Sequence, residues 1–587
     1  PVAAVAEYPN VKLLHPEVPN FVTEEEMKWP PEGASTDGEL SQDWPTGDPK
    51  GFNLMIENSA DVSELANYIV DSLASRNSWT DPDKWFGQLA WRVEITDDHK
   101  EYTFYLRQGV KWHPVSAVNL ASQKYAWLNL AHEVTAHDFV FALDMTLNPQ
   151  VQNGFTKSYY QDVESYRAVD DYTLVVRWKT KTYQSLSATL GLNPLPKFLY
   201  AFDESGQEYP KETLGLRLNQ HWYNNKGIVG TGPYRFEAYQ PGVKITLVRN
   251  EEYFGQKPAL KRLTYPIYTD TKQTVLKLKS GEINFGELKP GQYREEVLIW
   301  KDKPVASRPQ NNPFVNGKLE CVVQDYPAYS YLGWNADKPL FSDAKVRTAM
   351  TLALNRELLI QEVFVGLGTV ATGPWLPQTG QLDPSIDPLE FDLDRAKKLL
   401  SEAGWSDTDG DGLLDKVLGG QKTPFEFTLL IYGNRPEYTS LGNIFKEDLL
   451  KIGVKLNIEA ADWSLMQKRM DEKKFDAFTG GWATGWDNDP YQLWHSSQAD
   501  IPKGSNRVGF RNPEADTLIE ELRSTFDPEK RTTMLRRLHR LIYDAQAYSF
   551  LRVVQMPYCW AKEVKNVTFA KVRPIEDSKP WWVSSAN

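Results

Sequence analysis

Apolar and polar side chains alternate over residues 243–248, and a cluster of glycines precedes this segment. Alternation with a period of two predicts a half-buried β-strand. Gly227, Gly230, Gly232 and Pro233 predict a tight turn just before it. A Gly-Thr-Gly run also occurs in phosphate-binding loops, but here no lysine–serine pair follows, and a strand rather than a helix comes next. We therefore expect a turn followed by a strand, without bound phosphate.

Helical periodicity appears in both halves of the chain. Residues 61–73 carry apolar side chains at intervals of three and four, which predicts an amphipathic helix. In the second half, strands predicted at residues 424–430 and 454–458 alternate with helices predicted at residues 438–452 and 463–470. Strands that alternate with helices favour a parallel sheet, so the predicted fold class is α/β.

Length and charge restrict the class of protein. A chain of 587 residues exceeds what one hydrophobic core supports and implies at least two domains. The formal net charge is −12 and no basic cluster occurs, so nucleic acid and anionic membrane surfaces are poor partners. No window of about 18 or more apolar residues occurs, so no membrane-spanning helix is predicted. The 20 tryptophans and 28 tyrosines suggest a recognition surface, although packing in several cores explains most of them.

Residue types that carry catalysis are sparse. The two cysteines, Cys321 and Cys559, are too few for a metal cluster or a disulfide framework, and two buried thiols are the simplest interpretation. The eight histidines form no His-Glu-x-x-His motif and no close His-Asp-Ser grouping. We therefore do not expect an enzyme.

Three motifs share their order and spacing with a known family. Residues 88–107 read as two strands joined by a turn, with Leu-Ala-Trp in the first and Thr-Phe-Tyr-Leu-Arg in the second, and Gly-Val-Lys-Trp follows. The glycine-rich turn reads Gly-Thr-Gly-Pro-Tyr, and residues 331–349 combine Tyr-Leu-Gly-Trp-Asn with Asp343, Arg347 and Ala349. Together they resemble the oligopeptide/dipeptide-binding family (family 5) of bacterial ABC-transporter extracytoplasmic solute-binding proteins. The resemblance covers most of the chain.

The resemblance implies an α/β fold of the two-lobed periplasmic-binding-protein type (type II-like), with an extra subdomain inserted in the first lobe and two crossing hinge segments. The implied parts are lobe I at residues 1–70, 193–320 and 555–587, inserted subdomain II at residues 71–192, and lobe III at residues 321–554. The crossing segments would be residues 321–334 and 548–559. If they run antiparallel and adjacent, Cys321 and Cys559 lie opposite one another, the geometry that a disulfide needs, and an exported protein permits that bond. Free thiols are the alternative.

An acidic loop at residues 407–415 offers oxygen ligands at alternate positions. This pattern is typical of loops that wrap one calcium ion, although Leu418 stands where the bidentate glutamate of an EF-hand would be. The predicted ligands of a structural Ca²⁺ are Asp407, Asp409, Asp411, Leu413 and Asp415. A solvated acidic turn is the alternative. No cofactor is predicted for function.

The resemblance also implies ligand-binding residues in lobe III. Peptide receptors of this family use an aspartate after a Gly-Trp pair to bind the peptide's α-amine, and here Asp487 is adjacent to that position, which Trp486 occupies. Arg435 matches the position from which dipeptide receptors bind the ligand carboxylate, and arginine favours bidentate pairing with a carboxylate. Trp463 matches a cleft tryptophan, and Trp482 belongs to the Gly-Trp pair. Ordinary packing or a surface ion pair is the alternative for each residue.

Three functions are compatible with the sequence. The first is a receptor that captures an oligopeptide between its lobes and delivers it to an ABC importer in the membrane. The second is a receptor of the same family for another solute, with cello- or other oligosaccharides foremost because tryptophan faces stack on sugar rings. The third is a carboxylate-based hydrolase, for which Asp487 and Asp489 are too close in sequence to flank a scissile bond.

The expected partners are the ligand and the permease of the transporter. We expect a monomer at the periplasmic or extracellular face of the membrane, with a lipid anchor as one mode of attachment. The chain begins at Pro1 without a leader, which fits a product whose export signal has been removed.

Overall fold

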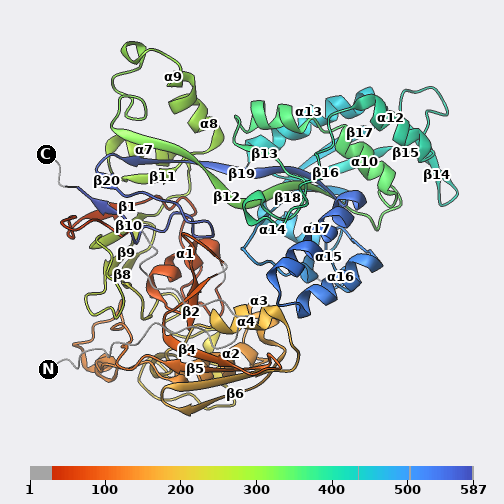
Figure 1. The fold of residues 1–587 in the computed structure, drawn as a ribbon. Coiled ribbons are helices and arrows are strands. Elements are labelled where there is room, and N and C mark those ends of the chain that lie inside the picture. Colours follow the sequence, from red (N-terminus) through yellow and green to blue (C-terminus); the bar gives the residue numbers. More distant parts are fainter. Residues whose placement is uncertain (1–28, 58, 83, 434, 502–503, 585–587) are drawn as a thin grey trace. The chain divides into compact units, whose positions relative to one another are not determined.

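The computed structural model describes residues 29–584, except residues 58, 83, 434 and 502–503, and these residues form two compact units. Unit 1 contains the described chain up to Leu288, Glu296–Val322, and the chain from Tyr558 onward; unit 2 contains Lys289–Glu295 and Val323–Pro557. The chain passes from unit 1 to unit 2 within β12 (Leu319–Trp334) and returns within β19 (Tyr548–Ala561), two neighbouring strands of one sheet (Figure 1). The separate subdomain at residues 71–192 stays a prediction.

Unit 1 contains two four-stranded sheets. One has the order β4 (Ala90–Ile95), β5 (Glu101–Leu106), β7 (Thr173–Trp178) and β6 (Val163–Asp170), and α2 (Ala136–Leu147) packs against β6 and β7. The other has the order β1 (Glu39–Ser41), β10 (Arg262–Pro266), β9 (Lys244–Arg249) and β8 (Tyr234–Gln240). The two strands predicted within residues 88–107 form the antiparallel pair β4–β5, and the alternating segment at residues 243–248 forms β9.

Shorter elements complete unit 1. Its other strands are β2 (Ala74–Arg76), β3 (Trp85–Gly87), β11 (Phe285–Glu287), β20 (Val564–Lys565) and β21 (Trp582–Val583). Its other helices include α1 (Ala60–Ile69), α3 (Gly154–Tyr160), α4 (Tyr183–Leu190), α5 (Lys197–Tyr200), α6 (Leu214–Leu218), α7 (Lys272–Ser280) and α9 (Ile299–Lys301).

The Gly-Thr-Gly run lies against the end of α1. A Cβ atom on Gly230 would lie 2.0 Å from the carbonyl oxygen of Ile69, and the Gly232 N–H donates to that same oxygen at 2.8 Å. Glycine is therefore required for the close approach of two backbones at this turn. The predicted helix at residues 61–73 ends earlier, at Ile69, because the backbone is extended at Val70.

The cysteines of unit 1 form a disulfide. Cys321 on β12 and Cys559 on β19 have Cα atoms 4.1 Å apart and are bonded. Cys559 also lies opposite Gly286 in the antiparallel pairing of β11 with β19. The opposed arrangement implied by the family resemblance is therefore present, and the interpretation as free thiols was wrong.

A segment at residues 114–132 packs within unit 1. It contains the 3₁₀ helix Gln123–Leu128, and the ring of Trp127 lies 5.8 Å from that of Phe202 and 6.4 Å from that of Trp222. A Cβ atom on Gly206 would lie 2.9 Å from the Trp127 ring, so glycine leaves room for the indole. The aromatic residues of this segment are thus used for packing against residues 202–222.

A seven-stranded sheet has the order β11, β19, β12, β18 (Ala477–Ala483), β16 (Glu426–Tyr432) and β17 (Lys455–Ala461), with β13 (Gly368–Val370) paired to β19. Its strands β18, β16, β17 and β13 lie in unit 2. β16 is parallel to both β17 and β18, as the alternation of strands and helices predicted. Phe427, Leu429 and Ile431 belong to one buried cluster and Leu430 to another, so both faces of β16 are covered. This explains its nearly continuous apolar sequence.

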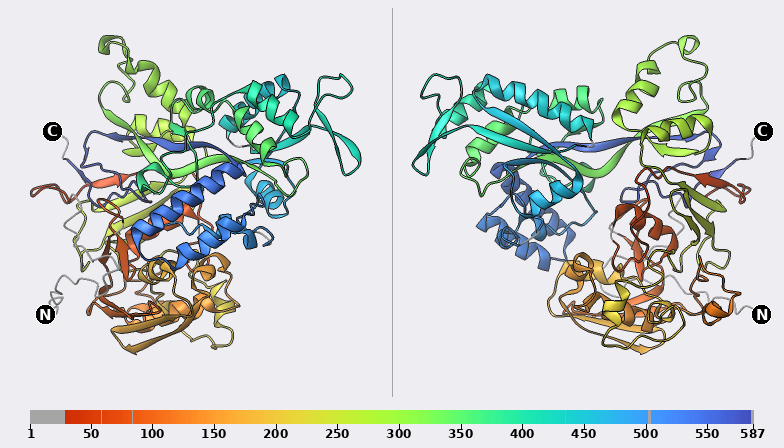
Figure 2. Two further views of the ribbon diagram at one scale, coloured as in Figure 1. Left: turned by 45° about the vertical axis from the view of Figure 1, so that its right-hand side comes forward. Right: turned by 180° about the vertical axis from the view of Figure 1, so that it is seen from behind.

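Helices cover this sheet. The predicted helices at residues 438–452 and 463–470 are α13 (Pro436–Lys451) and α14 (Trp463–Asp471). α16 (Pro513–Ser524) and α17 (Pro528–Ala545) pack against one another, as both views of Figure 2 show. Unit 2 also contains α8 (Pro290–Tyr293), α10 (Ala344–Leu352), α11 (Arg356–Leu358), α12 (Leu393–Glu402), β14 (Asp415–Leu418), β15 (Gln421–Pro424) and α15 (Tyr491–Trp494). Among the described residues, no helix is long and apolar enough to cross a membrane.

Candidate functional site

The predicted ligand residues of unit 2 gather at one edge of its sheet. Arg435 follows the carboxyl end of β16 and caps α13, while Trp463 follows the carboxyl end of β17 and begins α14. Trp482 is the second-last residue of β18, and the loop that follows carries Trp486 and Asp487. Because β17, β16 and β18 are neighbours and parallel, their carboxyl ends meet at the same edge. In open α/β sheets this edge is where ligands bind.

Trp482 is held by an aromatic wall. Its partner in the antiparallel pairing with β12 is Tyr329, and its indole N–H donates to the Tyr548 hydroxyl at 3.4 Å. Tyr548 stacks on Tyr331, with ring centroids 3.7 Å apart and planes at 10°. Gly480 makes this possible, since a Cβ atom there would lie 2.6 Å from the Tyr331 ring. The wall is buried while Trp482 itself is only partly covered, so one face of a fixed indole can meet a ligand.

Trp463 and Arg435 are more accessible. The Trp463 side chain is 55% exposed and makes an edge-to-face contact with Tyr432, with centroids 6.0 Å apart. Arg435 is exposed at the N-terminus of α13, where the N–H groups of the first turn also favour an anion. This pair therefore offers an apolar surface and a cation at the carboxyl ends of neighbouring strands.

Asp487 differs from Arg435 in that its charge is already neutralised by another side chain of the protein. Its carboxylate accepts a hydrogen bond from the Arg531 guanidinium at 2.6 Å, and the two side chains are 6% and 12% exposed. The backbone carbonyl of the preceding Trp486 accepts a hydrogen bond from the Gln381 side chain at 3.1 Å. Arg531 lies on α17, 44 residues beyond Asp487, and no local pattern in the sequence pointed to it. A ligand amine that binds Asp487 has to compete with Arg531.

The acidic loop brings together three of its predicted calcium ligands. Carboxylate oxygens of Asp407, Asp409 and Asp415 lie within 4.8 Å of one another. Asp411 is outside this group, and its carboxylate accepts a hydrogen bond from the N–H of Leu413 at 2.8 Å. The three converging carboxylates provide the oxygen donors that Ca²⁺ prefers, which is a partial fit to the predicted ligand set.

A lysine on β15, which no pattern in the sequence connected with this loop, reaches its carboxylates. The Lys422 ammonium is 2.5 Å from a carboxylate oxygen of Asp409 and 3.2 Å from one of Asp415. The hydrogen bond from Lys422 lowers the pKa of Asp409, and the same contact raises the pKa of Lys422. The clustered carboxylates are thus partly neutralised by the protein itself, so repulsion among them does not require a metal ion.

Three histidines have structural roles. The Nε2 atoms of His113, His221 and His539 lie 3.0, 2.8 and 3.0 Å from backbone carbonyl oxygens. Burial lowers the pKa of His113 and of His221 to about 4, and it also lowers the pKa of His539. A neutral imidazole that donates its N–H to a backbone carbonyl serves a structural role. These three histidines are therefore not positioned to act as general bases.

Comparisons with known proteins give a consistent result. The family described as bacterial extracellular solute-binding proteins, family 5, matches residues 84–502. The oligopeptide-binding protein AppA of Bacillus subtilis is 28% identical over 546 residues, covering 92% of this chain and 90% of that protein. The heme-binding protein A of Haemophilus influenzae is 26% identical over 499 residues, covering 83% of this chain and 80% of that protein.

A solved structure shares the fold as well. The structure of Bacillus subtilis AppA in complex with a nonapeptide superposes with a TM-score of 0.74 at 27% identity, covering 94% of this chain and all of that one. The predicted α/β fold of the periplasmic-binding-protein type is therefore confirmed.

Proposed function

The chain belongs to family 5 of the bacterial extracellular solute-binding proteins, and from that premise we propose that it captures an oligopeptide and delivers it to an ABC importer. The observation that carries the proposal is the gathering of Arg435, Trp463 and Trp482 at the carboxyl ends of three neighbouring parallel strands. The relative named above as oligopeptide-binding, AppA of Bacillus subtilis, supports the same ligand class.

Each predicted residue has a role in this proposal. Arg435 pairs with the peptide's carboxylate. Among the described residues, Arg435 belongs to no buried ion pair that the peptide would have to break. Trp463, Trp482 and Trp486 supply surface for side chains of varied sequence. Asp487 binds the α-amine only in competition with Arg531, so the N-terminus is the less tightly held end of the peptide.

We further propose that the protein works as a monomer at the extracytoplasmic face of the membrane, with the permease of the transporter as its partner. No cofactor takes part in ligand capture. Attachment through a lipid stays a prediction.

The first prediction is that the protein binds peptides without cleaving them. A mixture of short peptides should bind in calorimetry, and Arg435→Ala should weaken binding by about 1.5–3 kcal/mol, the range for a hydrogen bond to a charged group. Mass spectrometry of the peptides after incubation should show no new products.

The control is Arg395→Ala, which removes an exposed arginine on α12 and should leave binding unchanged. Cello-oligosaccharides serve as the alternative ligand. Binding of these sugars with no binding of peptides would contradict the oligopeptide proposal, and cleavage products would contradict a pure receptor.

The second prediction concerns the acidic loop, where we propose a structural Ca²⁺ held by Asp407, Asp409 and Asp415, with Asp411 and Leu413 completing the loop. Calcium in excess should stabilise the protein by about 2.7 kcal/mol when its concentration is 100 times the dissociation constant, since it binds only the folded loop. Thermal unfolding with calcium and with chelator measures the effect, and Asp409→Ala should abolish it.

Lys422→Gln should increase the calcium response, because the competing ammonium is removed. Glu390→Gln, at an exposed residue outside the loop, is the control. If neither the native protein nor Lys422→Gln responds to calcium, the loop is an ordinary turn neutralised by Lys422.

A further inference from the structure

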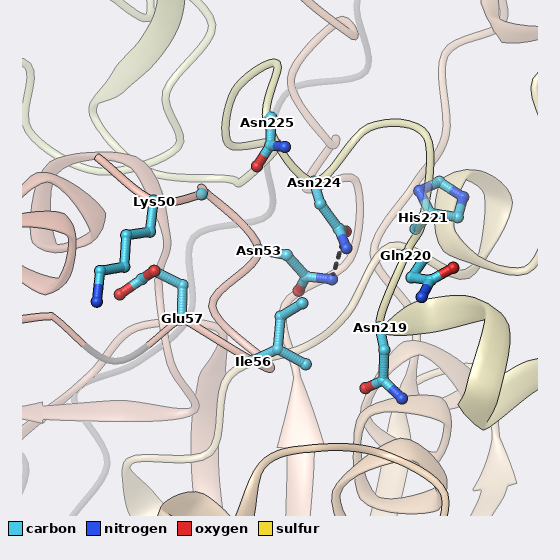
Figure 3. Close-up of a pocket in the computed structure, with 10 residues that line it drawn as sticks. Lys50, Asn53, Ile56, Glu57, Asn219, Gln220, His221, Asn224 and Asn225 are labelled. Atoms are coloured by element: carbon cyan, nitrogen blue, oxygen red, sulfur yellow. Dashed lines mark hydrogen bonds between the residues drawn. The ribbon is translucent and has the colours of Figure 1, made fainter. Parts of the chain in front are cut away.

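Unit 1 contains a polar cavity of about 520 Å³ that is lined by none of the predicted ligand-binding or metal-binding residues. Two segments line it, residues 50–57 before α1 and residues 219–225 after α6. Figure 3 shows Lys50 and Glu57 together on one flank, the Asn53–Asn224 pair in the centre and Gln220 on the opposite flank. Both segments belong to unit 1, so the cavity is complete within that unit.

The floor of the cavity is fixed by hydrogen bonds. The Asn53 amide donates to the Asn224 side chain at 2.9 Å, and the Asn224 amide donates to the Leu218 carbonyl at 2.9 Å. The Asn53 side-chain oxygen accepts from the N–H of Met55 at 3.0 Å. The two segments are also joined by the Phe52 N–H, which donates to the Asn224 carbonyl at 2.7 Å. These two amides therefore shape the cavity and have little capacity left for a ligand.

Two further lining residues are also committed to the protein. Asn219 accepts from the Gln152 N–H and donates to the Gln150 carbonyl, each at 2.8 Å. His221 is neutral and bonded at both nitrogens, to the Phe202 carbonyl and to the Tyr223 N–H. The wall beside the floor is thus rigid as well.

Four side chains in the cavity retain hydrogen-bonding capacity. Among the described residues, no hydrogen bond or ion pair involves the Lys50 ammonium or the side-chain amides of Gln220 and Asn225. One Glu57 oxygen accepts from the Ser59 N–H at 2.8 Å, which leaves the other oxygen for a ligand. Although Lys50 and Glu57 lie on the same flank, no ion pair within 4.0 Å joins them.

We infer that this cavity binds a free α-amino acid with a polar side chain. The Glu57 carboxylate would accept from the ligand's ammonium and Lys50 would donate to its carboxylate, so the two neighbouring charges match the two charges on one α-carbon. The ligand's side chain then extends over the Asn53–Asn224 floor toward the amides of Gln220 and Asn225, each of which offers both a donor and an acceptor.

The composition of the cavity favours a zwitterion over other solutes. A simple anion meets Glu57 and a simple cation meets Lys50, so each gains one attraction and one repulsion. Ile56 is the one aliphatic side chain among the described lining residues, and none of these is Phe, Tyr or Trp, so the large aromatic face typical of sugar binding is lacking. The inference does not depend on the proposed capture of oligopeptides in unit 2.

Calorimetry with L-glutamine as the probe tests this site on the full chain. L-glutamine should bind, Glu57→Gln should weaken it about tenfold because a charge-assisted hydrogen bond is lost, and Lys50→Gln should weaken it about threefold because this ammonium is exposed. N-acetyl-L-glutamine and L-glutamine amide each lack one charge, and both should bind more weakly than L-glutamine. Hydrogen exchange should slow at residues 50–57 and 219–225 when L-glutamine is added.

The matched control is Lys211→Gln with Glu212→Gln, which removes the same two charges at exposed positions outside the cavity. It should leave L-glutamine binding unchanged, and Trp482→Ala in unit 2 should do the same. The inference is overturned if L-glutamine does not bind at millimolar concentration, if the two charge-deleted analogues bind as tightly, or if Trp482→Ala rather than the cavity variants abolishes binding. Peptide binding by unit 2 is measured separately, so either proposal can fail alone.

Discussion

Asp487→Asn is expected to lower the free energy of unfolding by about 3–5 kcal/mol, the cost of removing one charge from a buried ion pair. The Arg531 guanidinium is 12% exposed and lies 2.6 Å from the carboxylate that this substitution neutralises. Asparagine keeps the shape of the side chain, so the loss is electrostatic rather than a packing defect. Denaturant unfolding of the two proteins measures the difference.

The double variant Asp487→Asn with Arg531→Met provides the internal test. When both charges are removed, the buried guanidinium is removed together with the carboxylate, and the loss of stability should be smaller than in Asp487→Asn alone. Asp500→Asn is the matched control, since Asp500 pairs with Arg511 at 2.7 Å but is 80% exposed. That substitution should cost at most about 1 kcal/mol. Equal losses from Asp487→Asn and Asp500→Asn would contradict a buried pair.

The stability of the Asp487 variant also decides how its affinity for peptides is interpreted. A loss of peptide affinity in an Asp487 variant reports ligand contact only if the variant is folded under the conditions of the measurement. Arg435 is exposed, so the peptide affinity of an Arg435 variant is not confounded by the loss of a buried ion pair. The two ends of the proposed peptide therefore have to be tested by variants with different stability controls.

Replacing both cysteines with alanine is expected to destabilise the protein by about 5 kcal/mol, because the disulfide closes a long loop in the unfolded chain. Cys321 and Cys559 are 238 positions apart in sequence, so the bond restricts most of the second half of the chain when it is unfolded. Residues 323–557 of unit 2 lie inside the loop that the bond closes, so the full loss should appear only when both units are unfolded.

Reducing agent provides the control for this second result. Reductant strong enough to open the bond should bring the native protein to the midpoint of the Cys321→Ala, Cys559→Ala variant and should leave the variant unchanged. An equal midpoint for the oxidised native protein and the variant would show that the disulfide contributes nothing to stability.

The periodicity of apolar residues along the chain was sufficient to predict many of the strands and helices. The alternation at residues 243–248 became β9, and the succession of strand and helix at residues 424–470 became β16, α13, β17 and α14 with β16 and β17 parallel. The pattern works because the side-chain direction repeats every two residues in a strand and about every 3.6 residues in a helix. The placement of Arg435 and Trp463 at the carboxyl ends of neighbouring strands follows from the same succession.

Contacts between residues distant in sequence were decided by the tertiary structure. Arg531 reaches Asp487 from α17, Lys422 enters the acidic loop from β15, and residues 50–57 meet residues 219–225 to form the polar cavity of unit 1. The charge on each of these side chains is evident from the sequence, but its partner is not, because a pairing energy depends on a distance that only packing sets. The sequence by itself therefore determined which elements form and which residue types stand at their ends, and only the folded chain decided which charges are neutralised and which stay available to a ligand.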